Sequence, residues 1–515
     1  MGRELRAATG VLAACLLGTY SALALAGFVF DDVALVVQNT LTAHPDRWLD
    51  AFRTDLWKTS GVDHFSGYFR PLLVLDLMLD RALFGLSPMA HHLHSVAWHL
   101  LAVGLLLALL RQLLPPTAAL AGAALFAMHP VQSEAVAWVA ARNDLMATSF
   151  VLAAVLVLLP REVGVGRLVA GAALTLLGLL SKESAVLTPF ALGLLDLARF
   201  RRLGSAPRYA SCLLALGAWW SLRAAAEIPD ASLPSGGQLA ILAHEAPRLA
   251  AHYASLLLVP HPLTVGTFLT YLRESAGQYV LLAALVGLLL ACARRGGLLA
   301  CAGLLLAAAA LSPAILAIAV RGQVGERYLY LPLAGLAITV ASALPERRAV
   351  LWALAPVLAG WTLLLHERLP AWRSDLTLWE AAHRDSPSPY TSHSLAAVLV
   401  KEGRTEEAIK RYQAALEGPA PYHAACLPAV TLALNAGYTA LAARGAQLVV
   451  DAHCPKSARL AGAAGQAALD VGDVALARRL TDDVDPEGDA ALLSVLETLA
   501  GLEDSDPSET EPHPP

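Results

Sequence analysis

The sequence predicts an all-α protein that crosses a membrane about eleven times and then continues into a short solenoid of helical repeats. Hydrophobic residues fill 57% of the 515 positions and charged residues only 15%, whereas about a quarter of a soluble protein is charged. The apolar residues form runs long enough for helices that cross a bilayer. A net charge of −5 gives no basic surface for nucleic acid. We therefore expect the lipid bilayer, and no nucleic acid, as a partner.

Eleven apolar runs define the expected membrane helices. Because lysine and arginine gather in cytoplasmic loops, the arginine pairs at 294–295 and 347–348 should lie on the same side as Arg3 and Arg6. They do so only if the apolar stretch at 244–260 lies at the outer interface without crossing. This predicts a multi-pass inner-membrane protein with a cytoplasmic N-terminus. The expected runs are 7–29, 92–111, 116–129, 143–159, 167–181, 184–199, 208–223, 278–293, 298–319, 327–344 and 349–366.

These patterns divide the chain into a membrane domain at 1–367, a repeat domain at 368–502 and an acidic, proline-rich tail at 503–515 that should be disordered. Two large loops, 30–91 and 224–277, are expected on the periplasmic side together with the repeat domain. Most polar signals of the membrane domain fall on that same side.

The first loop contains an amphipathic segment that ends at Phe84. Its leucine and methionine side chains lie on one side, and Asp76, Asp80 and Arg81 lie opposite. Such a segment is typical of a helix that lies in the plane of the membrane interface.

The repeat domain shows a spacing typical of tetratricopeptide repeats. Three glycines recur at intervals of 34 and 35 residues, and each is followed five residues later by an alanine that lets two helices pack closely. About three repeats are expected, with an alanine-rich helical bundle as the alternative. The glycines are Gly403, Gly437 and Gly472, and the alanines are Ala408, Ala442 and Ala477.

Two adjacent acids, Asp31 and Asp32, follow the first apolar run. Carboxylates are costly near hydrocarbon unless they have a function. Partial desolvation raises the pKa of a carboxylate and suits it to act as a general base. The alternative is a pair of acids that simply faces water where the helix leaves the membrane.

A second cluster begins after Pro130, which suits the first turn of a helix. Glu134, Trp138 and Arg142 recur every four residues, so a continuous helix would place them on one face. An acid, an indole and a guanidinium together suit a sugar ring and a phosphate. Asp144 follows at the end of this stretch. The alternative is an ion-paired face that braces two spans.

Two further clusters lie on the same predicted side. Lys182, beside Glu183, is placed to reach a lipid phosphate, although snorkelling alone also explains a lysine there. Arg327 and Tyr328 open a helix whose N-terminal amides favour an anion, and Glu326 can orient the arginine. The alternative is an aromatic belt with a basic anchor.

No metal site and no cofactor are expected. Four histidines between 91 and 99 fit a three-ligand site on a helix poorly. The six cysteines lack CxxC spacing. Cys426 and Cys454 fall in the predicted oxidising compartment, and the sequence leaves open whether they pair.

Seven motifs in order resemble the transmembrane and tetratricopeptide-repeat O-mannosyltransferases and their bacterial relatives, over roughly residues 10–420. The motifs are Phe28-Val-Phe-Asp-Asp32, Tyr68-Phe-Arg-Pro-Leu72, Leu83-Phe-Gly-Leu-Ser-Pro88, His129-Pro-Val-Gln-Ser-Glu-Ala-Val-Ala137 with Arg142-Asn-Asp144, Ser181-Lys-Glu183, Glu326-Arg-Tyr-Leu-Tyr-Leu-Pro332 and Trp372-Arg-Ser-Asp375.

This resemblance implies the GT-C class of glycosyltransferases, which take a sugar from a polyprenyl phosphate and invert the anomeric centre. The acid of the family's first outer loop maps onto Asp31 and Asp32, and we expect Asp31 to be the base. From their charge and side, Arg142, Lys182 and Arg327 are the candidates for the donor phosphate. The expected donor-binding set is Arg70, Glu134, Trp138, Arg142, Asp144, Lys182, Glu183, Glu326, Arg327 and Tyr328.

The sequence thus predicts an enzyme that moves a sugar such as mannose from a polyprenyl-phosphate donor to an acceptor, for example a protein hydroxyl presented by the repeats. The alternative is a non-catalytic membrane-anchored repeat scaffold for envelope protein assembly. A scaffold predicts that the acids and cations do not line a common cavity. A transporter is disfavoured because polar breaks at the membrane midplane are missing from the apolar runs.

Overall fold

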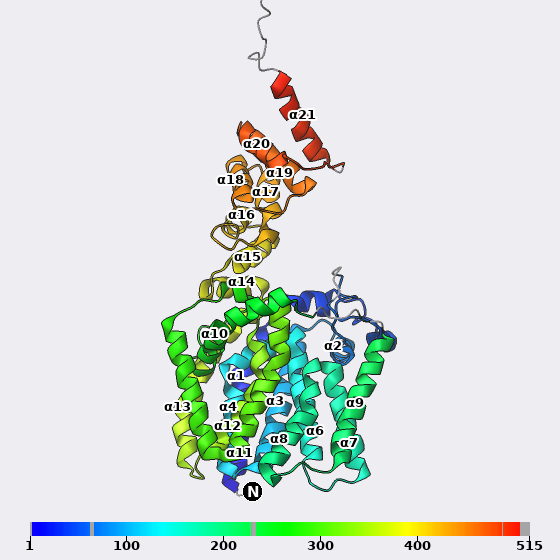
Figure 1. Cartoon of the computed structure of the whole chain (residues 1–515), viewed down its shortest axis with the longest axis vertical. Coiled ribbons are helices and arrows are strands. Elements are labelled where there is room, and N and C mark those ends of the chain that lie inside the picture. The colour runs from blue at the N-terminus through cyan, green and yellow to red at the C-terminus, as the bar shows by residue number, and fades with distance from the viewer. Residues whose placement is uncertain (1–2, 62–65, 227, 229–232, 487, 505–515) are drawn as a thin grey trace, which may run out of the picture. The chain divides into compact units, whose positions relative to one another are not determined.

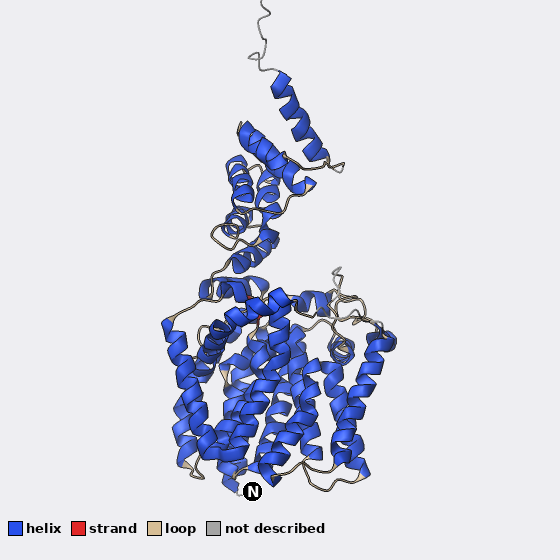
Figure 2. Ribbon diagram, viewed as in Figure 1, coloured by secondary structure: helices blue, strands red, loops and turns tan. Residues whose placement is uncertain are grey.

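The protein forms two compact, almost entirely helical units, Met1–Leu378 and Trp379–Pro515 (Figures 1 and 2). We call them the membrane unit and the repeat unit. A short antiparallel pair of strands, β1 (Thr267–Phe268) and β2 (Gln323–Val324), joins two loops of the membrane unit. The computed structural model describes residues 3–61, 66–226, 228, 233–486 and 488–504.

Helices occur at all eleven predicted apolar runs. The two runs on either side of Gly297 form one continuous element that bends there, because this glycine has φ 60° and ψ −142°, outside the helical region. The helices are α1 (Arg3–Tyr20), α3 (Pro88–Leu113), α4 (Pro116–Met128), α6 (Arg142–Leu158), α7 (Val165–Ser181), α8 (Thr188–Phe200), α9 (Ala206–Ala225), α11 (Ala276–Arg321), α12 (Tyr330–Ala343) and α13 (Ala349–Arg368).

Five segments of the described chain are long and apolar enough to cross a membrane, and several shorter apolar helices accompany them. The five are Arg6–Leu25, Pro88–Leu113, Val139–Leu158, Ala276–Arg321 and Ala349–Arg373. The chain is a multi-pass helical membrane protein, as its composition predicts.

The stretch that was expected not to cross forms α10 (Gly236–Leu258), which begins with a capping box between Ser235 and Gln238. Figure 1 shows α10 lying obliquely near one end of the membrane unit, against α11. Its assignment to the outer interface, like the orientation of the whole chain, remains a prediction.

The amphipathic segment of the first loop forms α2 (Pro71–Phe84). Its acidic face is directed inward, since Asp76 and Asp80 are both buried. Each accepts a hydrogen bond from Nη1 of Arg142, at 2.5 and 2.6 Å respectively. His94 adds a contact between its Nδ1 and Oδ1 of Asp80 at 2.6 Å. The acids therefore neutralise a buried arginine, which the sequence pattern of α2 does not reveal.

Arg142 is fully buried at the start of α6. Besides the two carboxylates, it donates from Nε to Ser95 Oγ at 3.0 Å and from Nη2 to the carbonyl of His91 at 2.6 Å. Asp76, Asp80 and His94 have their ligand atoms close enough together for a metal ion, but the guanidinium already supplies the positive charge between the two acids. This cluster braces α2, α3 and α6.

The repeat unit contains three successive helix pairs at the predicted spacing. The three turn glycines have positive φ angles of 74°, 75° and 78°, and the alanines five residues later are fully buried. The pairs are α15 (Pro389–Lys401) with α16 (Thr405–Ala414), α17 (Cys426–Asn435) with α18 (Thr439–Asp451), and α19 (Ala458–Leu469) with α20 (Val474–Thr481), followed by α21 (Ala490–Asp504). Their assignment as tetratricopeptide repeats remains a prediction.

Cys426 and Cys454 form a disulfide within the repeat unit. A disulfide is typical of an oxidising compartment, which agrees with the predicted periplasmic side for this unit. Positions 505–515 of the predicted tail lie outside the described residues.

Replacing Arg142 by glutamine should destabilise the membrane unit, because Asp76 and Asp80 would be left as buried acids without a cation. Breaking a buried ion pair from one side costs about 3–5 kcal/mol. Thermal unfolding of purified protein in detergent measures the effect, with the exposed Arg111→Gln variant as control. A stable Arg142→Gln protein that loses only donor binding would instead make Arg142 a ligand.

Candidate active site

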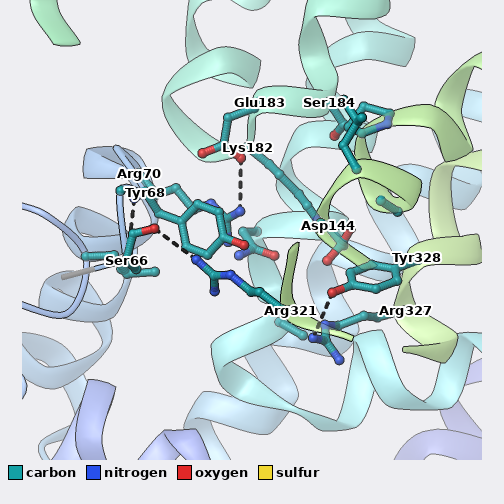
Figure 3. Close-up of a pocket in the computed structure, with 18 of the residues that line it drawn as sticks. Ser66, Tyr68, Arg70, Asp144, Lys182, Glu183, Ser184, Arg321, Arg327 and Tyr328 are labelled. Carbon is teal, nitrogen blue, oxygen red and sulfur yellow. Dashed lines mark hydrogen bonds and ion pairs between the residues drawn. The ribbon is translucent and has the colours of Figure 1, made fainter. Parts of the chain in front are cut away.

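A cavity of about 970 Å³ lies in the membrane unit where the ends of α6, α7, α9 and α11 meet the loop before α2 (Figure 3). Eight of the twelve expected site residues line it, although they come from distant parts of the sequence. These are Asp31, Arg70, Trp138, Asp144, Lys182, Glu183, Arg327 and Tyr328.

The two adjacent acids face different surroundings. Asp32 is fully buried; its Oδ1 accepts the Ala140 N–H at 2.7 Å and its Oδ2 the Val29 N–H at 3.5 Å. Asp31 is only partly buried and lines the cavity. Burial raises the pKa of Asp31 to about 6, against the opposing charge of Arg327, and raises the pKa of Asp32 to about 8. Asp31 is thus the acid that a ligand can reach.

Ion pairs fix the cationic side chains of the cavity wall. Burial alone would raise the pKa of Glu183, but Arg70 holds it below its ordinary value. Burial lowers the pKa of Lys182, and Asp144 opposes that shift. The pairs are Arg70 Nη2 with Glu183 Oε2 at 2.9 Å, which Figure 3 shows, Lys182 Nζ with Asp144 Oδ1 at 2.5 Å, and Arg327 Nη1 with Glu134 Oε1 at 2.6 Å.

Aromatic rings also contact the arginine side chains of the cavity wall. The guanidinium of Arg327 lies 4.6 Å from the ring centre of Trp138 and 4.8 Å from that of Tyr328. Tyr68 lies between two arginines, with Arg70 at 4.0 Å and Arg321 at 4.4 Å from its ring centre. Such contacts orient guanidinium groups without neutralising them.

Arg321 and Tyr68 are cavity residues that the sequence reasoning missed. Arg321 donates from Nη2 to the Ser66 carbonyl at 2.9 Å, and within the described chain no carboxylate lies at ion-pair distance from it. One signal was available in the sequence. Arg321 follows the run at 298–319 on the predicted periplasmic side, where the distribution of positive charge disfavours an arginine.

The cavity wall has more cations than carboxylates. Five basic side chains line it, against three acids. The basic residues are Arg70, Lys182, Arg223, Arg321 and Arg327, and the acids are Asp31, Asp144 and Glu183. Glu134, behind the wall, adds a fourth carboxylate through its pair with Arg327, so the basic side chains exceed the described carboxylates by one and the cavity favours an anionic ligand.

Six buried polar atoms of the lining residues have no hydrogen-bond partner among the residues that the structure describes. Buried polar groups are normally satisfied, and each unsatisfied one costs about 1–3 kcal/mol. A ligand with both donors and acceptors would satisfy them. The donors are Arg70 Nε, Trp138 Nε1 and Trp219 Nε1, and the acceptors are Asn143 Oδ1, Asp144 Oδ2 and Glu183 Oε1.

The expected shared face of Glu134, Trp138 and Arg142 is wrong. The helix α5 (Ser133–Ala137) ends before Trp138, whose ψ of 110° is not helical, and a short 3-10 helix follows before α6. The Ala140 N–H donates to Asp32, so the backbone after Trp138 bonds the turn that carries Asp31 and Asp32. Trp138 consequently lines the cavity while Arg142 lies in the α2 cluster.

Glu134 and Glu326 lie behind the cavity wall. Glu134 accepts both the backbone N–H of Arg327, at 2.8 Å, and its guanidinium. Glu326 is buried and accepts the Thr264 N–H at 2.5 Å. Burial raises the pKa of Glu326 to about 8, although Arg368 opposes the shift. Of the two acids, Glu134 is therefore the one that orients Arg327.

Comparison with known proteins identifies relatives for part of the chain. This chain is 37% identical over 177 residues to the protein O-mannosyl-transferase Tmtc1 of Drosophila melanogaster. The aligned segment covers 33% of this chain and 20% of that protein. The chain is 38% identical over 185 residues to Tmtc2 of the same organism, with 34% and 20% covered. With TMTC3 of Mus musculus it shares 35% identity over 156 residues, with 30% and 16% covered.

The matched segment thus spans at most a fifth of the length of these relatives. No protein-family profile matches the chain. Among solved structures, ArnT from Cupriavidus metallidurans bound to undecaprenyl phosphate aligns with a TM-score of 0.40 at 16% identity, covering 96% of this chain and 77% of that chain. The sequence comparisons support the resemblance that the motifs indicate: about a third of the chain is similar to the TMTC protein O-mannosyl-transferases.

Proposed function

We propose that this protein is a membrane glycosyltransferase that moves a sugar from a polyprenyl phosphate to an acceptor hydroxyl on the periplasmic face. One observation carries the proposal: a single cavity holds an accessible carboxylate, an excess of cations and unsatisfied polar atoms. The names of the sequence relatives support the same reaction class. A non-catalytic scaffold would not require these groups to share a cavity.

The donor phosphate is proposed to bind beside Arg321. Arg70, Lys182 and Arg327 are already paired with carboxylates, whereas the nearest partners of Arg321 are a backbone carbonyl and the ring of Tyr68. Because Arg321 is exposed, its guanidinium could donate charge-assisted hydrogen bonds to a phosphate. The same guanidinium would stabilise the phosphate as it leaves the sugar.

The polyprenyl chain is proposed to leave the cavity between α9 and α11. Trp220 and Leu316 line the cavity, and their side chains are 63% and 50% exposed. These residues fall in the predicted spans 208–223 and 298–319, so we expect their exposed surface to meet lipid. The cavity wall there is otherwise apolar, with Ala310, Pro313 and Ala317. An isoprenoid tail would therefore pass from the cavity into the bilayer without crossing water.

Asp31 is proposed to remove the proton from the acceptor hydroxyl. The acceptor oxygen then forms a bond to the anomeric carbon, and the bond from that carbon to the phosphate oxygen breaks, leaving its electron pair on the phosphate. Attack from the side opposite the phosphate inverts the anomeric centre. A pKa raised to about 6 by burial leaves Asp31 ionised at neutral pH and more basic than an exposed aspartate.

The sugar is proposed to lie against Trp138 and Tyr328. Both residues line the cavity, and aromatic rings suit the apolar face of a pyranose. The unsatisfied oxygens of Asn143, Asp144 and Glu183 would accept bonds from sugar hydroxyls. Mannose is one sugar that fits this chemistry. A protein hydroxyl presented by the repeat unit is the proposed acceptor.

Asp31→Asn should abolish transfer while leaving the fold intact, because asparagine keeps the size of the side chain but cannot accept the proton. The expected loss is about 10²–10⁴-fold. Transfer of radiolabelled sugar from lipid to acceptor measures it, and Asp46→Asn, an exposed acid in the same loop, serves as the control. Full activity of Asp31→Asn would refute the assignment.

Arg321→Gln should weaken binding of polyprenyl phosphate by about 10–100-fold, the equivalent of one charge-assisted hydrogen bond. Native mass spectrometry or thermal stabilisation by the lipid measures the affinity. Arg47→Gln, an arginine exposed on the first loop, is the matched control. Unchanged affinity in Arg321→Gln would remove this residue from the phosphate site.

The pH profile of kcat/KM should fall on the acid side with a midpoint near pH 6. The base must be ionised, and burial raises the pKa of Asp31 to about 6, so activity is present above this pH and is lost as the pH decreases through it. Initial rates between pH 4 and 8, at about one-unit intervals, provide the profile. A midpoint near 4 would mean that the base is a solvated carboxylate.

A further inference from the structure

The turn that carries Asp31 contains a backbone conformation that is unusual for its residue. Phe30 has φ 55°, in the left-handed region, which residues with a bulky side chain rarely adopt. Strained conformations of this kind persist only where surrounding contacts hold them, and they cluster at functional sites. The contacts that hold Phe30 are therefore relevant to the orientation of Asp31, the next residue.

The end of the membrane unit supplies one of these contacts. The Phe30 N–H donates to Oδ1 of Asp375 at 2.7 Å, across 345 residues of sequence. Close by, the Gly27 N–H donates to the carbonyl of Trp372 at 3.2 Å. A Cβ on Gly27 would lie 2.6 Å from the carbonyl oxygen of Arg373. The two segments are thus in direct backbone contact, and Gly27 permits it.

The other side of the turn is anchored as well. His92 Nε2 lies 3.0 Å from the Gly27 carbonyl oxygen, and Asp32 accepts the Ala140 N–H. The ring of Phe30 packs 5.1 Å from the ring of Trp138, a cavity residue. Asp31 is consequently held between an anchor on Phe30 and an anchor on Asp32.

We propose that Asp375 is a positioning residue that holds the left-handed turn at Phe30 and thereby directs the Asp31 carboxylate into the cavity. It acts through the main chain and does not line the cavity itself. The inference rests on the proposed function, in which Asp31 is the base. It gives a role to the motif Trp372-Arg-Ser-Asp375, which contributes no residue to the cavity lining.

Two substitutions separate this role from a general effect on folding. Asp375→Asn keeps an oxygen that can accept the Phe30 N–H, whereas Asp375→Ala removes it. Glu380→Ala, an exposed acid on the same helix α14 (Asp375–Asp385), is the matched control. All three are made in the full-length protein and purified in detergent.

Hydrogen exchange of peptides that cover residues 27–32, measured without substrate, tests the contact itself. In Asp375→Ala, the Phe30 amide should exchange about tenfold faster or more, because the hydrogen bond to Asp375 that protects this amide is lost. Asp375→Asn and Glu380→Ala should exchange like the wild type. Unchanged exchange in Asp375→Ala would overturn the proposal, whether or not the protein transfers sugar.

Transfer activity then tests the consequence for the base. Asp375→Ala should lose about 10–100-fold in kcat, since misplacement of a catalytic group by about 1 Å has effects of this size. The midpoint of the fall in its kcat/KM on the acid side should also move toward the pKa of a solvated aspartate. Asp375→Asn should restore most of the rate. Equal losses in both variants with an unmoved midpoint would overturn the positioning role, while an inactive wild type would refute the proposed function instead.

Discussion

Compensation of buried charge is the constraint on which the membrane unit depends. In a medium of low dielectric constant, an ionised group is tolerated only with a partner. Arg142 meets this constraint with Asp76 and Asp80, and the resulting cluster fixes α2 against α3 and α6. Three of the five basic side chains that line the cavity are likewise paired with carboxylates. Arg321 is exposed and has no carboxylate partner in the described chain, so its guanidinium remains available to the anionic ligand that we propose.

The same constraint gives two neighbouring acids different roles. Asp32 is buried and bound to two backbone amides, so its carboxylate belongs to the architecture of the turn. Asp31 remains accessible from the cavity, and burial makes it more basic than a surface aspartate. The strained turn at Phe30 and its contact with Asp375 connect the first and last motifs of the membrane unit at this point.

The sequence predicted the helices well because apolar runs of sufficient length have few alternatives in a bilayer. Eight of the expected site residues line one cavity; the sequence grouped them because the predicted topology places their loops on one side of the membrane. It failed where tertiary partners decide the outcome. Arg142 was assigned to the phosphate from its charge and predicted side, and to one face with Trp138 because a helical period was assumed. The helix instead ends before Trp138, and the Ala140 N–H bonds Asp32. The acids of α2 were expected at the membrane interface. Their partner, the buried Arg142, lies 66 and 62 residues away along the chain, so no local pattern reveals it.

A cryo-electron microscopy structure of the protein with a bound polyprenyl-phosphate sugar tests the central claim most directly. We expect the phosphate within hydrogen-bond distance of Arg321, the sugar against Trp138 and Tyr328, and the Asp31 carboxylate on the side of the anomeric carbon opposite the phosphate. A donor bound outside the cavity, or a phosphate held by Arg142 with Asp31 remote from the sugar, would contradict the account.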